Sequence, residues 1–114
     1  MTQTSDYPLS DEALDTLKKV IIEALKGIYD PEIPVNIYDL GLIYHIFIDP
    51  QGVVTIEMTL TTPACPVAQT FPGTVENVIN AITGVSETQV ELVWDPPWTS
   101  KSMSEAAKLQ LGIL

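Results

Sequence analysis

The sequence has few positively charged residues, and it has little histidine or cysteine. It contains no arginine, five lysines, one histidine and one cysteine, against 15 acidic residues, so its formal net charge is −10. Binding to nucleic acid is not expected, because no basic patch can displace counterions from phosphates. Binding to an anionic membrane is not expected for the same reason. Cations and basic protein surfaces remain as charge-complementary partners.

Long hydrophobic runs are also missing. No stretch approaches the roughly 18 apolar residues of a membrane span, and residues 1–10 carry neither the basic residue nor the apolar run of a secretory signal. A single cysteine excludes an internal disulfide framework. With 46% hydrophobic residues in 114, we expect one folded domain over residues 11–114, after a flexible N-terminus of residues 1–10, in the cytoplasm.

The first half of the sequence predicts a helix followed by a hairpin. Ser10 is a good N-cap, apolar residues recur at helical spacing from Asp11 to about Lys26, and Gly27 suits the C-cap. Two strands over 41–48 and 54–60 flank Asp49-Pro50-Gln51-Gly52, which matches a type I turn.

The second half predicts a helix, a strand and a short last helix. Pro66 suits a first helical position, Pro72-Gly73 predicts a kink or a restart, and Gly84 closes the helix. Residues 89–94 alternate as a strand, and Ser102-Met103-Ser104-Glu105 matches a capping box. The expected fold is α+β: a two-layer sandwich in the order α-β-β-α-β-α, with a three-stranded mixed sheet.

Cys65 is the first candidate for chemistry. If Pro66 begins the helix, Cys65 lies near its N-cap, where unpaired amides and the helix dipole favour a thiolate. The alternative is a small apolar filler in a strand-to-helix turn. One thiol cannot hold an iron–sulfur cluster alone, so further ligands would come from a second copy, a partner, a small thiol or nearby carboxylates. The same count argues against a structural zinc site.

Three acids form the second candidate. Asp30 and Glu32 lie on a loop stiffened by prolines, and Asp39 follows shortly after. They could orient an iron ion or a thiol proton, or Asp30 could simply begin a turn, as Asp before Pro often does. Thr61 and Thr62 could donate hydrogen bonds to a thiolate or sulfide, or only end a strand.

The only histidine, His45, is centred in a strand pattern, which favours a structural hydrogen bond over pairing with Cys65 as a nucleophile. No G-x-S-x-G elbow and no Gly-rich phosphate loop is present. The last candidate is a partner-docking surface formed by Trp94, Pro96, Pro97 and Trp98. Alternatively, both indoles pack the last helix onto the sheet.

Three motifs in order resemble the SufT/PaaD-like family. They are DPEIPVNIYDLGLIY at 30–44, TTPACP at 61–66, and WDPPW at 94–98 followed by MSE at 103–105 and LG at 111–112. The resemblance runs from about Leu14 to Ile113. It implies a compact α/β domain like those of iron–sulfur assembly scaffolds, with the reactive cysteine at Cys65 and the acids at Asp30 and Glu32.

The resemblance implies a non-enzymatic role in assembling iron–sulfur clusters or delivering them to apoproteins. The sequence lacks the P-loop of fused carriers and the cysteine-rich tail of the oxygenase-linked branch, which favours a stand-alone, SufT-like member. Cys65 would hold a transient cluster or iron, and the partners would be assembly proteins and client apoproteins. A cluster bridging two chains would require a homodimer. The alternatives are an adaptor that carries no cluster, including one that assists oxygenase assembly, and a Cys65 thiol enzyme.

Overall fold

A mixed three-stranded sheet organises the fold. The structure, a computed structural model, describes residues 8–30, 33–61 and 67–112. Within them the elements are α1 (Asp11–Leu25), β1 (Ile43–Ile48), β2 (Val53–Met58), α2 (Val67–Asn80), β3 (Glu87–Leu92), a 3-10 turn η1 (Ser100–Ser102) and α3 (Glu105–Leu111). This order confirms the α+β fold that the sequence predicts.

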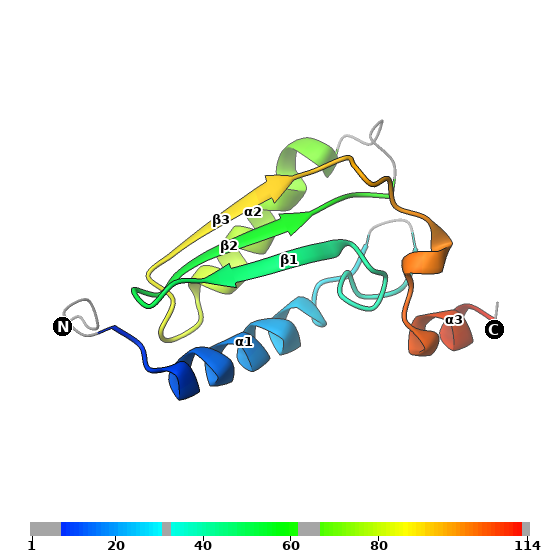
Figure 1. Ribbon diagram of the computed structural model, residues 1–114. Helices are drawn as coiled ribbons and strands as arrows, with labels where there is room; N and C mark the ends of the chain where they lie inside the picture. Colours follow the sequence, from blue (N-terminus) through cyan, green and yellow to red (C-terminus); the bar gives the residue numbers. More distant parts are fainter. Residues whose placement is uncertain (1–7, 31–32, 62–66, 113–114) are drawn as a thin grey trace.

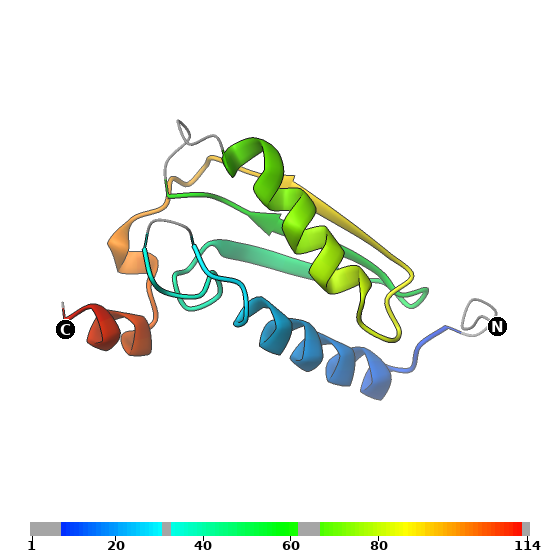
Figure 2. The same cartoon turned by 180° about the vertical axis from the view of Figure 1, so that it is seen from behind.

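The strands lie in the order β1-β2-β3, with β1 antiparallel and β3 parallel to β2. The tight hairpin explains the antiparallel pair, whereas the parallel pair needs the crossover that α2 supplies. Figure 2 shows α2 across one face of the sheet, and α1 runs alongside below β1 (Figure 1). These two helices therefore cover one face of the sheet, and no described helix covers the other.

The first helix begins where the sequence predicts and ends one residue early. The Ser10 hydroxyl accepts a hydrogen bond from the Ala13 amide at 3.1 Å, as an N-cap should. Leu17, Ile21 and Leu25, spaced four residues apart, are its buried residues. The C-cap is Lys26, not the predicted Gly27, because the Lys26 amide still bonds the Ile22 carbonyl at 3.0 Å.

The hairpin turn is built as predicted. The Gly52 amide donates to the Asp49 carbonyl at 3.0 Å, and the Asp49 carboxylate accepts from the amides of Gln51 and Val53 at 2.8 and 3.0 Å. The strands are shorter than predicted. β1 starts at Ile43 rather than Gly41 because Gly41 has a positive φ of 86°, and β2 ends at Met58 rather than residue 60.

The second helix passes through Pro72 as one continuous element, so the predicted restart is wrong; the predicted kink stays a prediction. Pro72 is the sixth residue of α2, so its missing amide removes one bond near the helix start and leaves the later turns paired. The third strand is shifted two residues towards the N-terminus, to 87–92 rather than 89–94. Val93 still bonds the Met58 carbonyl at 2.8 Å, but Trp94 lies beyond the strand.

The last helix is capped by a different serine from the one predicted. Ser104, not Ser102, is the N-cap of α3, and its hydroxyl accepts from the Ala107 amide at 3.1 Å. Ser102 ends η1 instead, and Met103 between the two turns is extended and buried. Burial of the Met103 side chain favours this break, which a capping pattern alone does not reveal.

The core lies between the helices and the sheet and continues beneath the segment after α1. Its fully buried apolar residues come from α1, from that segment, from β2 and from α2: Ile21, Leu25, Val35, Ile37, Leu40, Leu42, Val54, Ile56, Met58, Val75 and Ile79. Within residues 8–30, 33–61 and 67–112, none of the helices combines the length and the apolar character that crossing a bilayer requires.

Two glycines offer a matched test of the packing at the turn before β1. A Cβ at Gly41 would collide with the Ser102 backbone and would sit at positive φ, whereas a Cβ at Gly73 in α2 would meet nothing within 4 Å. We expect Gly41→Ala to lower the free energy of unfolding by about 2 kcal/mol or more. Gly73→Ala should leave it unchanged or raise it by up to about 1 kcal/mol. Urea unfolding checks both, and equal midpoints would contradict this account.

Candidate functional site

Three connecting segments meet at one end of the sheet. The segment after α1, the end of β2 and the segment after β3 all lie at this end (Figure 1). For β2 and β3 this follows from their parallel pairing, which puts both carboxyl ends on the same edge. The predicted site residues that the structure describes lie on these segments: Asp30 and Asp39 after α1, Thr61 after β2, and Trp94, Pro96, Pro97 and Trp98 after β3.

Residues from two of the predicted groups, the threonines after β2 and the tryptophan–proline segment after β3, line one cavity of about 160 Å³. It is lined by Thr59, Leu60, Thr61, Trp94, Pro97 and Trp98. The sequence separates Thr61 from the tryptophans by more than 30 residues, and the parallel pairing of β2 and β3 brings them together. Pro96 does not line this cavity.

The two tryptophans have different roles. The Trp98 indole donates a hydrogen bond to the Leu40 carbonyl at 2.7 Å and packs against the core, as the packing interpretation predicts. Trp94 keeps 43% of its surface exposed. A buried indole usually finds such a partner, and an exposed one is available for contact with another molecule. Of the two indoles, that of Trp94 is the one exposed enough to contact another molecule.

Tyr44 and Thr59 extend the site beyond the residues that the sequence singled out. The Tyr44 hydroxyl donates to the Pro96 carbonyl at 2.7 Å. Burial, and then the charge of Asp95, raise the pKa of Tyr44 above its usual 10.0, while the nearby Thr59 hydroxyl opposes them. Thr59 is only 1% exposed, and its Oγ1 forms no hydrogen bond of acceptable geometry with the described residues. The Tyr44–Thr59 contact is thus polar but not a formed hydrogen bond.

Neither residue was marked by the sequence. Thr59 occupies a polar position of an alternating strand pattern, which predicts exposure, and only the structure shows that it is buried between Met58 and Leu60. A tyrosine such as Tyr44 in a strand pattern is unremarkable.

The predicted acids shape turns. Asp30 is buried, and its carboxylate accepts from the Ile33 amide at 2.8 Å. The Asp39 carboxylate accepts from the Asn36 side-chain amide at 2.9 Å, and the Asp39 amide donates back to the Asn36 side chain at 2.9 Å. These are the local bonds that the turn interpretation predicts, and they hold both carboxylates in fixed positions.

Several predicted residues lie outside the described part of the chain: Glu32, Thr62, Cys65 and Pro66. Among the residues that are described, no group of three His, Cys, Asp or Glu side chains could hold a metal ion. His45 lies in β1, and its Nδ1 is 3.0 Å from Glu57 Oε1, which confirms the expected structural hydrogen bond.

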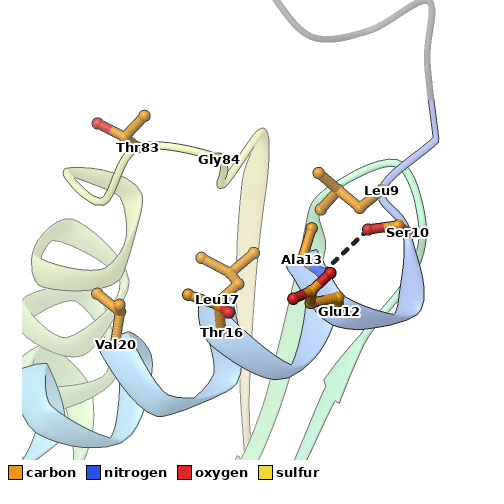
Figure 3. A pocket seen from close by; sticks show the side chains of 9 residues that line it. All are labelled: Leu9, Ser10, Glu12, Ala13, Thr16, Leu17, Val20, Thr83 and Gly84. Atoms are coloured by element: carbon orange, nitrogen blue, oxygen red, sulfur yellow. Dashed lines mark hydrogen bonds between the residues drawn. The ribbon is translucent and has the colours of Figure 1, made fainter.

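A larger cavity, of about 440 Å³, lies between the start of α1 and the turn at 83–84 (Figure 3). Glu12 is its only ionisable lining residue, among Leu9, Ser10, Ala13, Thr16, Leu17, Val20, Thr83 and Gly84. The bond from the Leu9 amide to the Pro50 carbonyl, at 2.7 Å, places this end of α1 beside the hairpin turn. None of the predicted site residues reaches it.

The Trp98 bond predicts an asymmetric response to matched substitutions. Trp98→Phe keeps most of the apolar surface but leaves the buried Leu40 carbonyl without its indole donor, so we expect a loss of about 1–3 kcal/mol in the free energy of unfolding. Trp94→Phe should cost less than about 0.5 kcal/mol, as is usual for exposed positions. Chemical denaturation of both variants measures the difference. Equal losses would show that the bond does not hold the segment.

The environment of Tyr44 predicts a pH dependence. The folded-state pKa is raised, so the contribution of Tyr44 to stability is complete below pH 10.0 and is lost as the pH rises through the folded-state value. Asp95→Asn should lower that pKa by removing the second cause of the shift. Absorbance titration at alkaline pH, with Tyr44→Phe subtracted to isolate this phenol, checks the direction. An unchanged titration in Asp95→Asn would refute the role of Asp95.

Comparison with known proteins agrees with the motifs. The family model described as "Iron-sulfur cluster assembly protein" matches residues 18–92. An "Fe-S protein maturation auxiliary factor" of Porphyromonas gingivalis is 42% identical over 93% of this chain and 100% of its own length. The "Fe-S protein maturation auxiliary factor SufT" of Staphylococcus aureus is 41% identical over 75% of this chain and 98% of its own length.

A solved structure shares the fold. A domain from Bacillus anthracis, titled as a domain of unknown function, superposes with a TM-score of 0.80 at 35% identity, covering 88% of this chain and 95% of that one. Together these matches confirm the SufT/PaaD-like resemblance of the motifs. The chain belongs to the iron–sulfur cluster assembly protein family, among relatives of SufT-type maturation factors.

Proposed function

We propose that this protein is a non-enzymatic factor for the maturation of iron–sulfur proteins, and that Cys65 holds iron or a cluster transiently as cargo. This chain matches nearly the whole length of relatives that are named as maturation auxiliary factors, and this supports the general role. A thiolate is the ligand that iron–sulfur clusters take from proteins, and Cys65 is the only thiol in the chain.

The observation that carries the proposal is the convergence of three segments at one end of the sheet. The connection that contains Cys65 leaves the described chain at Thr61 and rejoins it at Val67, the first residue of α2. It therefore starts at the cavity bordered by Trp94 and ends at a helix N-terminus, whose amides favour a thiolate near them. This setting supports a ligand role for Cys65.

The acids at this end would support the cargo rather than replace the thiol. Asp30 and Asp39 are held by the Ile33 amide and by Asn36, so their positions do not depend on cargo. Together with Glu32 they provide hard oxygen donors suited to iron. Thr61 and Thr62 would donate hydrogen bonds to a thiolate or sulfide. A cluster bridging two copies would supply further ligands and would form a homodimer.

Anaerobic reconstitution with iron and sulfide tests the cysteine directly. We expect the wild-type protein to develop the absorbance and Mössbauer signals of bound iron, and Cys65→Ala to lose at least about nine-tenths of that iron, because no second thiol is available. Light scattering on the same samples shows whether loading is accompanied by dimer formation.

The matched control is Glu87→Gln, which removes an exposed carboxylate at the start of β3, the opposite end of the strand from the site. It should load iron as the wild type does. Equal loading of Cys65→Ala and wild type would refute the ligand role. Normal activity of cluster enzymes in cells that carry only Cys65→Ala would refute its role in maturation.

A second candidate function is an adaptor that docks assembly proteins or clients without carrying a cluster. The exposed indole of Trp94, beside a cavity, favours it. An adaptor would lose partner binding in Trp94→Ala and keep it in Cys65→Ala, whereas a cargo carrier would show the reverse in iron loading. Trp98→Ala does not separate the two, since it also breaks the bond to Leu40.

A further inference from the structure

The two edges of the sheet are protected differently. At the β3 edge, the outward amide of Val90 donates to a carboxylate oxygen of Glu76 in α2 at 3.3 Å. Glu87 and Glu91 add exposed charges along the same strand. Charges and covered amides are the usual means by which proteins prevent unwanted pairing at a sheet edge.

The β1 edge has neither protection. Along an antiparallel strand, the backbone amide and carbonyl of successive residues point alternately towards the partner strand and away from it. The Asp49 amide points towards β2, because it donates to the Val53 carbonyl. Counting back along the register of β1 with β2, the amides and carbonyls of Ile48 and Ile46 point away from the sheet. No hydrogen bond joins them to another described residue. The strand, IYHIFI, has no carboxylate and no lysine; its ionisable side chains are Tyr44 and His45.

A groove follows this edge on the side of α1. It consists of two adjacent cavities of about 230 and 310 Å³ that share Lys18 and Ile46. The first is also lined by Ile22, Tyr38, Ile43, Tyr44 and His45, and the second by Leu14, Asp15 and Ile48. In an added strand, residues opposite Ile46 and Ile48 would point to the same face, towards these cavities.

We propose that the β1 edge binds an extended segment of a partner protein as a fourth strand. Main-chain bonds to Ile46 and Ile48 would provide affinity, and apolar side chains at alternate positions would enter the two cavities. The inference rests on the proposed function only in taking the partner from the proteins of iron–sulfur maturation. A segment bound here would lie beside the end of the sheet where the Cys65 connection begins.

Charge decides between the candidate occupants. Asp49 follows β1 directly, and Asp95 lies near Tyr44 at its other end. Asp15 lines the groove from α1, as Lys18 does, and its carboxylate is 3.4 Å from the Lys19 amine. A second copy would bring another net charge of −10 to this surface. A segment with basic residues flanking its apolar positions is complementary, so the occupant is a basic segment of another protein.

The test uses a synthetic peptide, acetyl-Lys-Lys-Val-Thr-Val-Thr-Val-Lys-Lys-amide, and the full-length protein. On saturation, we expect the amide hydrogen exchange of Ile46 and Ile48 to slow by about tenfold or more, because both amides become hydrogen-bonded. Exchange at Val90, whose amide is already bonded to Glu76, should not change. Peptides with N-methylated valines, or with glutamate in place of lysine, should bind at least about tenfold more weakly.

Two tryptophan substitutions on α1 provide the matched variants. Lys18→Trp fills the groove from the α1 residue that lines both cavities, and we expect it to weaken peptide binding about tenfold or more. Lys19→Trp, at a side chain that is 77% exposed, should bind as the wild type does. Iron loading should be normal in both, so a failure here is distinguishable from a failure of the proposed function.

Three results would overturn the inference. The first is an absence of protection at Ile46 and Ile48 in the presence of the peptide. The second is equal binding of the N-methylated peptide by the wild-type protein, a comparison that does not depend on any variant folding correctly. The third is protection of these amides by the protein alone, rising with its concentration, which would assign the edge to a second copy.

Discussion

The bond from the Trp98 indole to the Leu40 carbonyl attaches the segment after β3 to the turn before β1. The same turn receives the Ser104 amide on the Asp39 carbonyl at 2.8 Å. Gly41, at positive φ, lies where any side chain would strike the Ser102 backbone. These contacts fix the segment after β3 against the sheet, and the cavity beside Thr61 exists because that segment is fixed.

The site depends equally on the parallel pairing of β2 and β3. An antiparallel third strand would carry the tryptophan segment to the hairpin end of the sheet, away from the connection that contains Cys65. The crossover through α2 instead places both strand ends together. The start of the connection that contains Cys65, for which we propose cargo binding, thereby lies at the same end of the domain as the exposed Trp94. The uncovered β1 edge runs to that same end.

The acidity of the chain has structural uses beyond solubility. Carboxylates of Asp30, Asp39 and Asp49 each accept bonds that fix a turn, and the Glu76 carboxylate covers a free amide at the β3 edge. Because these groups satisfy local donors, the net charge of −10 is partly a consequence of how the turns are made. The rest gives the protein a field that favours basic partners over a second copy of itself.

The sequence by itself determined the element order, the hairpin turn at Asp49 and the cap at Ser10, because spacing and turn chemistry act over a few residues. The motifs also determined the family. Tertiary contacts decided where β3 ends, that Ser104 rather than Ser102 caps α3, and that α2 continues through Pro72. They also decided the separate roles of Trp94 and Trp98, and the joining of Tyr44 and Thr59 to the site. Such features depend on which buried group finds a partner across the fold, and no local pattern encodes that pairing.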